Sequence, residues 1–74
     1  MYRELELEIF RTFRTKRACA EFLGVHPSLI TKIVAGERPL RASEIEKLAD
    51  KFGIKTLERL REVFFTQELP SGNK

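Results

Sequence analysis

Several kinds of residue are scarce in this chain of 74 residues, and each shortage excludes a class of protein. A single cysteine excludes an intramolecular disulfide, and no apolar run approaches the roughly 20 residues that a membrane-spanning helix needs. The chain does not begin with the basic and then apolar stretch of a secretory signal. We therefore expect a cytoplasmic protein in a reducing compartment, with no membrane partner.

Residues that carry catalysis or bind metals are equally scarce. The lone histidine, His26, and the lone cysteine, Cys19, form neither a catalytic triad nor a set of three or four metal ligands. The sequence also lacks a paired acidic site and a glycine-rich phosphate loop. We expect no enzymatic activity, no cofactor, no metal and no small-molecule substrate. Cys19 is interpreted as a small buried hydrophobe, and His26 as a helix N-cap or a phosphate contact.

The remaining composition is that of one small globular domain. With 42% hydrophobic and 34% charged residues the chain is expected to fold, although a core of this size yields only a few kcal/mol. A dimer interface would add to that stability. We place the domain at residues 1–69 and expect residues 70–74 to be a disordered polar tail.

Positive charge is concentrated in the middle of the sequence. Residues 1–10 hold one basic and three acidic side chains, residues 11–41 hold seven and two, and residues 42–74 hold six of each. The net charge of +3 therefore comes from the middle segment, which alone carries seven minus two, or +5. A basic segment of this kind is typical of a surface that binds the phosphates of a nucleic acid.

Residues 15–36 are expected to form two short helices joined by a tight turn. Thr15 is a good N-cap, because its hydroxyl can accept from an unpaired N–H of the first turn. No helix breaker follows until Gly24, which can adopt the left-handed conformation that ends many helices. Ala20 lies on the apolar face, where its small side chain lets a second helix cross closely at roughly 90–120°.

The second helix of this segment is expected to begin at Pro27, with His26 as its N-cap, and to end at Gly36. Val25 in the turn is placed inside as an apolar plug. Apolar residues at positions 30, 33 and 34 define the buried face. The side chains that this pattern turns outward are Ser28, Leu29, Thr31 and Lys32.

Residues 2–13 give two conflicting signals. Apolar residues at positions 2, 5, 9, 10 and 13 fall roughly on one helical stripe, whereas positions 5, 7 and 9 alternate with glutamates as in a strand. We favour a helix, because leucine and glutamate are good helix formers and no second strand is available for pairing. Arg11 and Arg14 at its end either contact phosphate or are solvated charges.

Two further helices follow the central segment. Ser43, with Glu46 three residues later, predicts a capping box and a fourth helix that ends at Gly53. Thr56 is expected to cap a fifth helix. The apolar side chains that this fifth helix would carry are Leu57, Leu60, Val63 and Phe64. The expected fold class is all-α, a small bundle of about five helices around one core.

The end of the fifth helix is the candidate dimer interface. Two adjacent phenylalanines, Phe64 and Phe65, cannot both point to the same core, so one of them is available to a second subunit. Leu69 lies partly off the same stripe and joins this candidate interface. The alternative is that Phe65 simply folds over the edge of the domain.

The central segment resembles a known family. TKRACAEFLGV followed by HPSLITKIVAGERPL is similar to the helix-turn-helix of the Cro and lambda-repressor superfamily, the XRE type. The resemblance rests on the mutual spacing of Ala20, Gly24, Val25 and Ile30, and on Gly36 with a basic residue and a proline after it. It covers about half of the chain directly, and it implies a lambda-repressor-like fold and a DNA-binding regulator of phage, viral or bacterial type.

The resemblance also implies roles for single residues on double-stranded DNA. The positions that read bases correspond here to Pro27, Ser28, Leu29, Thr31 and Lys32. The residues expected to contact phosphates are Lys16, Arg17, His26, Arg38 and Arg41. Many family members have glutamine where this chain has Lys16 and Pro27, which puts adenine readout at that position in doubt.

The function expected from these observations is sequence-specific transcriptional regulation, as a Cro-like or repressor-like homodimer on a pseudo-palindromic operator with half-sites roughly 10 bp apart. The alternative is a protein-interaction module, such as an antitoxin or an anti-repressor, that uses the same fold to hold a partner protein. An acidic or apolar second motif helix would favour the alternative. Ser28, Thr31 and Lys32 are neither.

Overall fold

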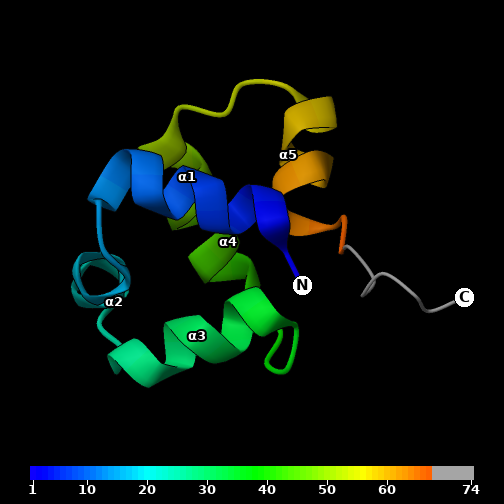
Figure 1. Cartoon of the computed structure of the whole chain (residues 1–74). Helices are drawn as coiled ribbons and strands as arrows, with labels where there is room; N and C mark the ends of the chain where they lie inside the picture. The colour runs from blue at the N-terminus through cyan, green and yellow to red at the C-terminus, as the bar shows by residue number, and fades with distance from the viewer. Residues whose placement is uncertain (68–74) are drawn as a thin grey trace, which may run out of the picture.

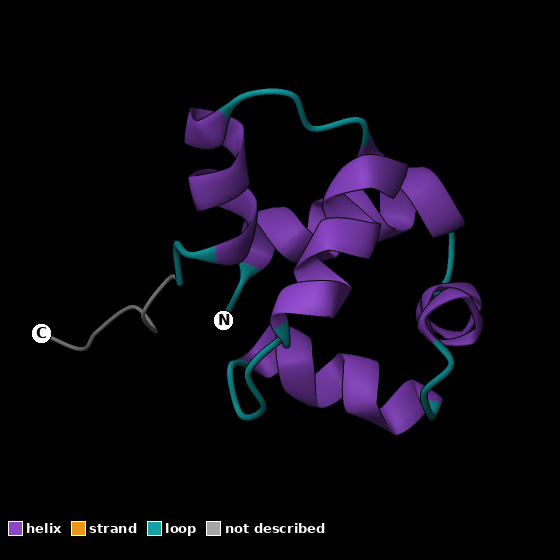
Figure 2. Cartoon of the chain, turned by 180° about the vertical axis from the view of Figure 1, so that it is seen from behind, coloured by secondary structure: helices purple, strands orange, loops and turns teal. Residues whose placement is uncertain are grey.

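The computed structural model, which describes residues 1–67, is a bundle of five α-helices (Figure 1). The helices are α1 (Arg3–Phe13), α2 (Lys16–Leu23), α3 (Pro27–Ala35), α4 (Ala42–Phe52) and α5 (Leu57–Phe64). Residues 1–67 contain no strand (Figure 2), so the all-α prediction is confirmed. The predicted disordered tail, residues 70–74, lies outside the described residues.

The first segment is the helix α1, and the strand interpretation of it was wrong. Leu5 and Ile9 are buried at 1% and 2% exposure, as the helical stripe predicted. Phe10 was assigned to the same stripe wrongly, because it is 48% exposed. Five residues correspond to about 140° around a helix, so Phe10 points well away from Leu5. Glu8 lies on the core side instead, with 5% exposure.

The core lies between all five helices. In Figure 1, α1 lies above α3, α2 is seen end-on beside them, and α4 lies behind α1. The N-terminal backbone is tied to α3, because the Tyr2 N–H donates to the Val34 carbonyl at 2.7 Å. The buried apolar residues are Leu5, Ile9, Cys19, Ala20, Ile30, Ile33, Val34, Leu48, Phe52, Val63 and Phe64.

The start of α4 differs from the prediction. The N-cap is Arg41 rather than Ser43, which lies inside the helix and is exposed. The carboxylate of Glu44, the third helical residue, accepts from the Arg41 N–H at 2.9 Å, and this side chain satisfies the N-terminus in place of a serine hydroxyl. The predicted end at Gly53 is confirmed.

The start of α5 is as predicted, although its apolar stripe is shorter. The Thr56 hydroxyl accepts from the Arg59 N–H at 3.1 Å, which confirms the cap. Val63 and Phe64 are buried and Leu60 is half-buried. Leu57 was wrongly placed on the core stripe and is 69% exposed, because it lies at the free end of the helix.

An ion-pair cluster joins α5 to α1. Arg59 Nη1 donates to Glu4 Oε1 at 3.1 Å and to Glu62 Oε1 at 3.0 Å, and its Nη2 donates to Glu8 Oε2 at 2.6 Å. Arg11 also pairs with the carboxylate of Glu8. Burial alone raises the pKa of Glu8, but the hydrogen bonds from Arg59 and Arg11 outweigh it and hold the pKa below its usual value of 4.5.

The Glu8–Arg59 pair predicts acid sensitivity. A carboxyl group whose pKa is lower in the folded than in the unfolded state stabilises the fold above about pH 4.5, and this stabilisation is lost as the pH falls further. We expect Arg59→Met to lower the free energy of unfolding by about 2 kcal/mol at pH 7, because a buried carboxylate loses its main partner. We also expect the variant to lose less stability than the wild type between pH 5 and about pH 3. The measurement is the thermal unfolding midpoint from pH 3 to 7.

A matched control for this variant is Arg61→Met. Arg61 is on the same helix and is exposed, and its side chain forms no ion pair within residues 1–67. Arg61→Met should leave both the stability at pH 7 and its pH dependence close to those of the wild type. Equal effects of the two variants would show that Arg59 does not stabilise the fold through Glu8.

Within residues 1–67, no single helix is long and apolar enough to cross a membrane. Together, α2 and α3 are long and apolar enough to cross a membrane, but the chain bends by 104° between them.

Candidate nucleic-acid interface

The turn between α2 and α3 sets the angle of the motif. Gly24 adopts φ +75°, and the Val25 N–H donates to the Ala20 carbonyl at 2.9 Å. Ala20 is completely buried, and Val25 packs half-buried against the core. The two helices are bent by 104° relative to one another. The predicted cap at Thr15, the glycine turn, the apolar plug and the crossing angle are therefore all confirmed.

The N-terminus of α3 is organised by His26. Its Nδ1 accepts from the Ser28 N–H at 3.1 Å, which confirms the predicted N-cap, and lies 2.9 Å from the Ser28 hydroxyl oxygen. Because an Nδ1 that accepts from an N–H carries no proton, the Ser28 hydroxyl donates to it and the ring proton lies on Nε2. Both side chains are exposed. This end of the helix thus offers one N–H donor and one hydroxyl acceptor to solvent.

The two faces of α3 separate by polarity. Ile30, Ile33 and Val34 are buried, as their spacing predicted. The exposed face of α3 brings together four of the predicted base-reading residues, namely Pro27, Ser28, Thr31 and Lys32. Lys32 forms no ion pair within residues 1–67, so its ammonium is available to a ligand.

Leu29 differs from the prediction. It was expected on the outward face, where it could pack on a thymine methyl group, but it is half-buried and packs against the core. The turn before α3 contains the half-buried Val25. At this end of α3, burial therefore includes Leu29 as well as the apolar stripe of Ile30, Ile33 and Val34. Only part of the Leu29 side chain is left for a contact in a DNA groove.

The candidate phosphate contacts on α2 differ in how far their side chains are exposed to solvent. Arg17 is exposed, with 81% of its side chain accessible, and lies 3.9 Å from a Glu21 carboxylate that is 74% accessible. An exposed pair of this kind is weak and gives way readily to a phosphate. Lys16 is more confined, at 32% accessibility and 3.7 Å from Glu6. Arg41, at the start of α4, is exposed.

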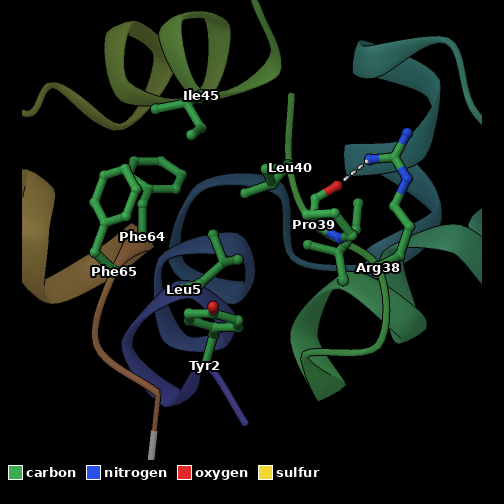
Figure 3. A pocket seen from close by; sticks show the side chains of 9 residues that line it. Tyr2, Leu5, Arg38, Pro39, Leu40, Ile45, Phe64 and Phe65 are labelled. Atoms are coloured by element: carbon green, nitrogen blue, oxygen red, sulfur yellow. Dashed lines mark hydrogen bonds between the residues drawn. The ribbon is translucent and has the colours of Figure 1, made fainter. Parts of the chain in front are cut away.

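Arg38 is engaged inside the protein. Its Nη1 donates to Glu44 Oε1 at 2.7 Å and to the Pro39 carbonyl at 3.0 Å, and its Nη2 donates to Glu44 Oε2 at 3.3 Å (Figure 3 shows the Pro39 bond). The hydrogen bonds from Arg38 hold the pKa of Glu44 below its usual value of 4.5. Arg38 therefore fixes the connection between α3 and α4. Its expected phosphate contact would compete with Glu44.

This arrangement predicts a structural role for Arg38. We expect Arg38→Ala to lower the free energy of unfolding by about 1–2 kcal/mol, because the Glu44 side chain, 11% accessible, loses two charged hydrogen bonds. Arg41→Ala, which removes a nearby exposed side chain, should change it by less than about 0.5 kcal/mol. Denaturant unfolding curves measure both. If both variants changed the free energy of unfolding by the same small amount, Arg38 would be a solvated charge with no structural role.

The candidate dimer residues are separated by the structure. Phe64 is 4% exposed and belongs to the core, so almost none of its surface is left for a second subunit. The backbone turns its neighbour Phe65 outward, and Phe65 is 62% exposed. Phe65 borders a pocket of about 120 Å³ lined mainly by apolar side chains from α1, α4 and the connection before α4 (Figure 3). Leu69 lies outside the described residues.

The family of the chain follows from its sequence over this same region. A family model described as helix-turn-helix, HTH_3, matches residues 14–60, which span α2, α3 and α4. The chain belongs to this family. HTH_3 is the XRE type of helix-turn-helix, the family of DNA-binding transcription regulators that the sequence resembled, and its members are typically not enzymes. No curated protein and no solved structure shows significant similarity to the chain.

Two features of this HTH_3 domain were not anticipated from its sequence. One is the burial of Glu8, whose position three residues after Leu5 was a signal for the core side of α1. The other is the pairing of Arg38 with Glu44 across the α3–α4 connection, which no local pattern indicated. Cys19 lies in the core, as expected, and its burial raises the pKa of its thiol to about 11.

Proposed function

We propose that the chain is a sequence-specific transcription regulator, Cro-like or repressor-like, that binds a pseudo-palindromic operator as a homodimer. The observation that carries the proposal is the polar, exposed face of α3, which holds Ser28, Thr31 and Lys32 on a helix set at 104° to α2. A helix held in this way can enter the major groove while the helix before it crosses the backbone.

The chemistry of this face suggests a division of roles. Lys32 can donate to O6 and N7 of a guanine, and Thr31 can bond to a base or to a phosphate. The Ser28 hydroxyl, which donates to His26, presents lone pairs that can accept from a cytosine or adenine amino group. Pro27 offers only apolar contact.

Phosphate contacts would set the position of the protein on the duplex without reading its sequence. Arg17 and Arg41 are exposed and suit this role, and Lys16 would join them by leaving Glu6. The Nε2–H of His26 is a further donor at the N-terminus of α3. Arg38 is the weakest candidate, since it is committed to Glu44.

The test is selection of duplexes from a random-sequence pool, with binding of the selected duplexes measured across a salt series. We expect enrichment of an inverted repeat with half-sites roughly one helical turn apart, and an affinity that falls steeply as salt rises. Binding without enrichment would contradict sequence-specific regulation. Negligible binding at low salt would favour the protein-interaction module instead.

A further inference from the structure

The two residues on either side of Pro27 are hydrogen-bonded to each other at the start of α3. The Nδ1 atom of His26 lies 3.1 Å from the Ser28 backbone nitrogen and 2.9 Å from the Ser28 hydroxyl oxygen. A backbone N–H can only donate, so Nδ1 is an acceptor and carries no proton. The hydroxyl must then donate to the same atom, because two lone pairs would otherwise face each other at 2.9 Å. His26 therefore fixes the direction of the Ser28 hydroxyl bond.

The local backbone places the imidazole ring beside Ser28. Pro27 disfavours helical geometry at the residue before it, and His26 is extended, with φ −71° and ψ 143°. The His26 carbonyl accepts from the Leu29 N–H at 2.9 Å, so the first turn of α3 begins directly after the extended residue. Both His26 and Ser28 are exposed. The hydrogen-bonded pair is thus formed before a ligand binds and is accessible to one.

The direction of this bond decides what the Ser28 hydroxyl can recognise. A hydroxyl has one proton and two lone pairs, and the proton is directed at Nδ1 of His26. The lone pairs can accept from the amino group of adenine or cytosine in the major groove. They repel O6 and N7 of guanine and O4 of thymine, which are acceptors as well. A serine whose hydroxyl rotates freely could donate or accept, and it would not distinguish these bases.

We propose that His26 is a positioning residue for base reading, which holds the Ser28 hydroxyl as an acceptor and thereby makes Ser28 selective for adenine or cytosine. The inference rests on the proposed function and names the bases that one position of α3 reads. The other ring nitrogen supports the same state. Nε2 carries the ring proton, and a phosphate that accepts from it keeps that proton away from Nδ1. Contact with the DNA backbone and selection of the base are then coupled through one ring.

The protonation state of the ring is tested in the protein without DNA. His26 is the single histidine of the chain, so its ring signals need no assignment. Nitrogen–proton correlation NMR spectra, recorded at about pH 8 where histidine side chains are ordinarily neutral, distinguish the two neutral forms. We expect the proton on Nε2. A proton on Nδ1 would overturn the inference, because Nδ1 could then accept from neither group of Ser28.

The base preference is tested by competition between variants of the selected operator, each with one base pair changed. At one position of the half-site, the wild type should bind adenine or cytosine about fivefold more tightly than guanine or thymine, as expected for one hydrogen bond. His26→Ala should reduce this ratio to less than about twofold, because the hydroxyl can then rotate. The ratio is insensitive to a phosphate contact of Nε2, since loss of that contact weakens binding to all sequences equally.

A conservative variant tests whether an acceptor at position 26 is what matters. Asparagine is a good N-cap, and its amide oxygen can accept from the N–H and the hydroxyl of Ser28. His26→Asn should therefore keep the ratio within about twofold of the wild type. Thr56→Ala removes the N-cap of α5, whose hydroxyl accepts from the Arg59 N–H at 3.1 Å, and controls for the stability lost with a cap. Thr56→Ala should leave the base preference unchanged.

The double variant shows whether His26 acts through Ser28. In a Ser28→Ala background, His26→Ala should not change the preference at this position, because the hydroxyl that it orients is absent. An additional loss of preference in the double variant would overturn the inference. So would a ratio in His26→Ala equal to that of Thr56→Ala, and in either case the selected operator would leave the regulator in place. A pool without an enriched sequence would instead remove the proposed function, and the base preference with it.

Discussion

Ala20→Leu is expected to lower the free energy of unfolding by about 3 kcal/mol, because the added side chain has no space between α2 and α3. Ala20 has 0% exposure, and its carbonyl accepts from the Val25 N–H in the turn that sets the 104° bend. A domain of this size has only a few kcal/mol of stability, so a large part of the population should unfold at 37 °C. Denaturant unfolding followed by circular dichroism measures the loss.

The control for this variant is Ala35→Leu. Ala35 is the last residue of α3 and is exposed, so the same added atoms find solvent there. Its stability should differ from that of the wild type by less than about 0.5 kcal/mol. If Ala20→Leu were no more destabilising than Ala35→Leu, the two motif helices would not depend on a small residue where they cross.

The parts of the fold that local chemistry determines could be predicted from the sequence. The threonine caps at Thr15 and Thr56 and the left-handed ends at Gly24 and Gly53 each depend on a side chain and its immediate neighbours. Helical periodicity then identified the buried face of α3 correctly. The helix pair of the motif was predictable because the cap at Thr15, the turn at Gly24 and the apolar stripe of α3 all indicate the same arrangement.

The parts that depend on distant residues could not be predicted in this way. The burial of Glu8 requires Arg59, which lies 51 residues further along the chain. The commitment of Arg38 requires Glu44, and the same carboxylate caps α4 two residues before the predicted position. Periodicity assigns a charged residue to solvent unless its partner is known, and the partner is known only once the helices are packed.

For the candidate nucleic-acid interface too, helical spacing predicted the exposed positions but not the burial that depends on packing. The exposed positions 27, 28, 31 and 32 of α3 follow from helical spacing, whereas Leu29 is half-buried instead of exposed. Spacing alone also left open which of Phe64 and Phe65 is buried. Leu29 lies at the edge of the apolar stripe, where packing of the turn decides its burial. The choice between Phe64 and Phe65 depends on which ring reaches Phe52, and Phe64 stacks on it at a ring distance of 6.2 Å.

Lys32→Ala is the change expected to alter operator binding most. Lys32 is exposed on α3, and a lysine that donates to a guanine contributes about 1–3 kcal/mol of discrimination against other bases. Since about 1.4 kcal/mol corresponds to tenfold in affinity, the variant should bind the selected operator roughly 5- to 150-fold more weakly. It should lose most of its preference at one base pair in each half-site.

The comparison of specific with nonspecific binding decides the role of Lys32. Loss of a guanine contact weakens binding to the operator and leaves binding to random duplex almost unchanged, whereas loss of a phosphate contact weakens both and reduces the salt slope by about one. Lys55→Ala, an exposed lysine between α4 and α5, is the matched control and should retain the operator affinity. An equal loss on all sequences would move Lys32 from base reading to phosphate contact. Ser28 and Thr31 would then be the residues of α3 that discriminate between base pairs.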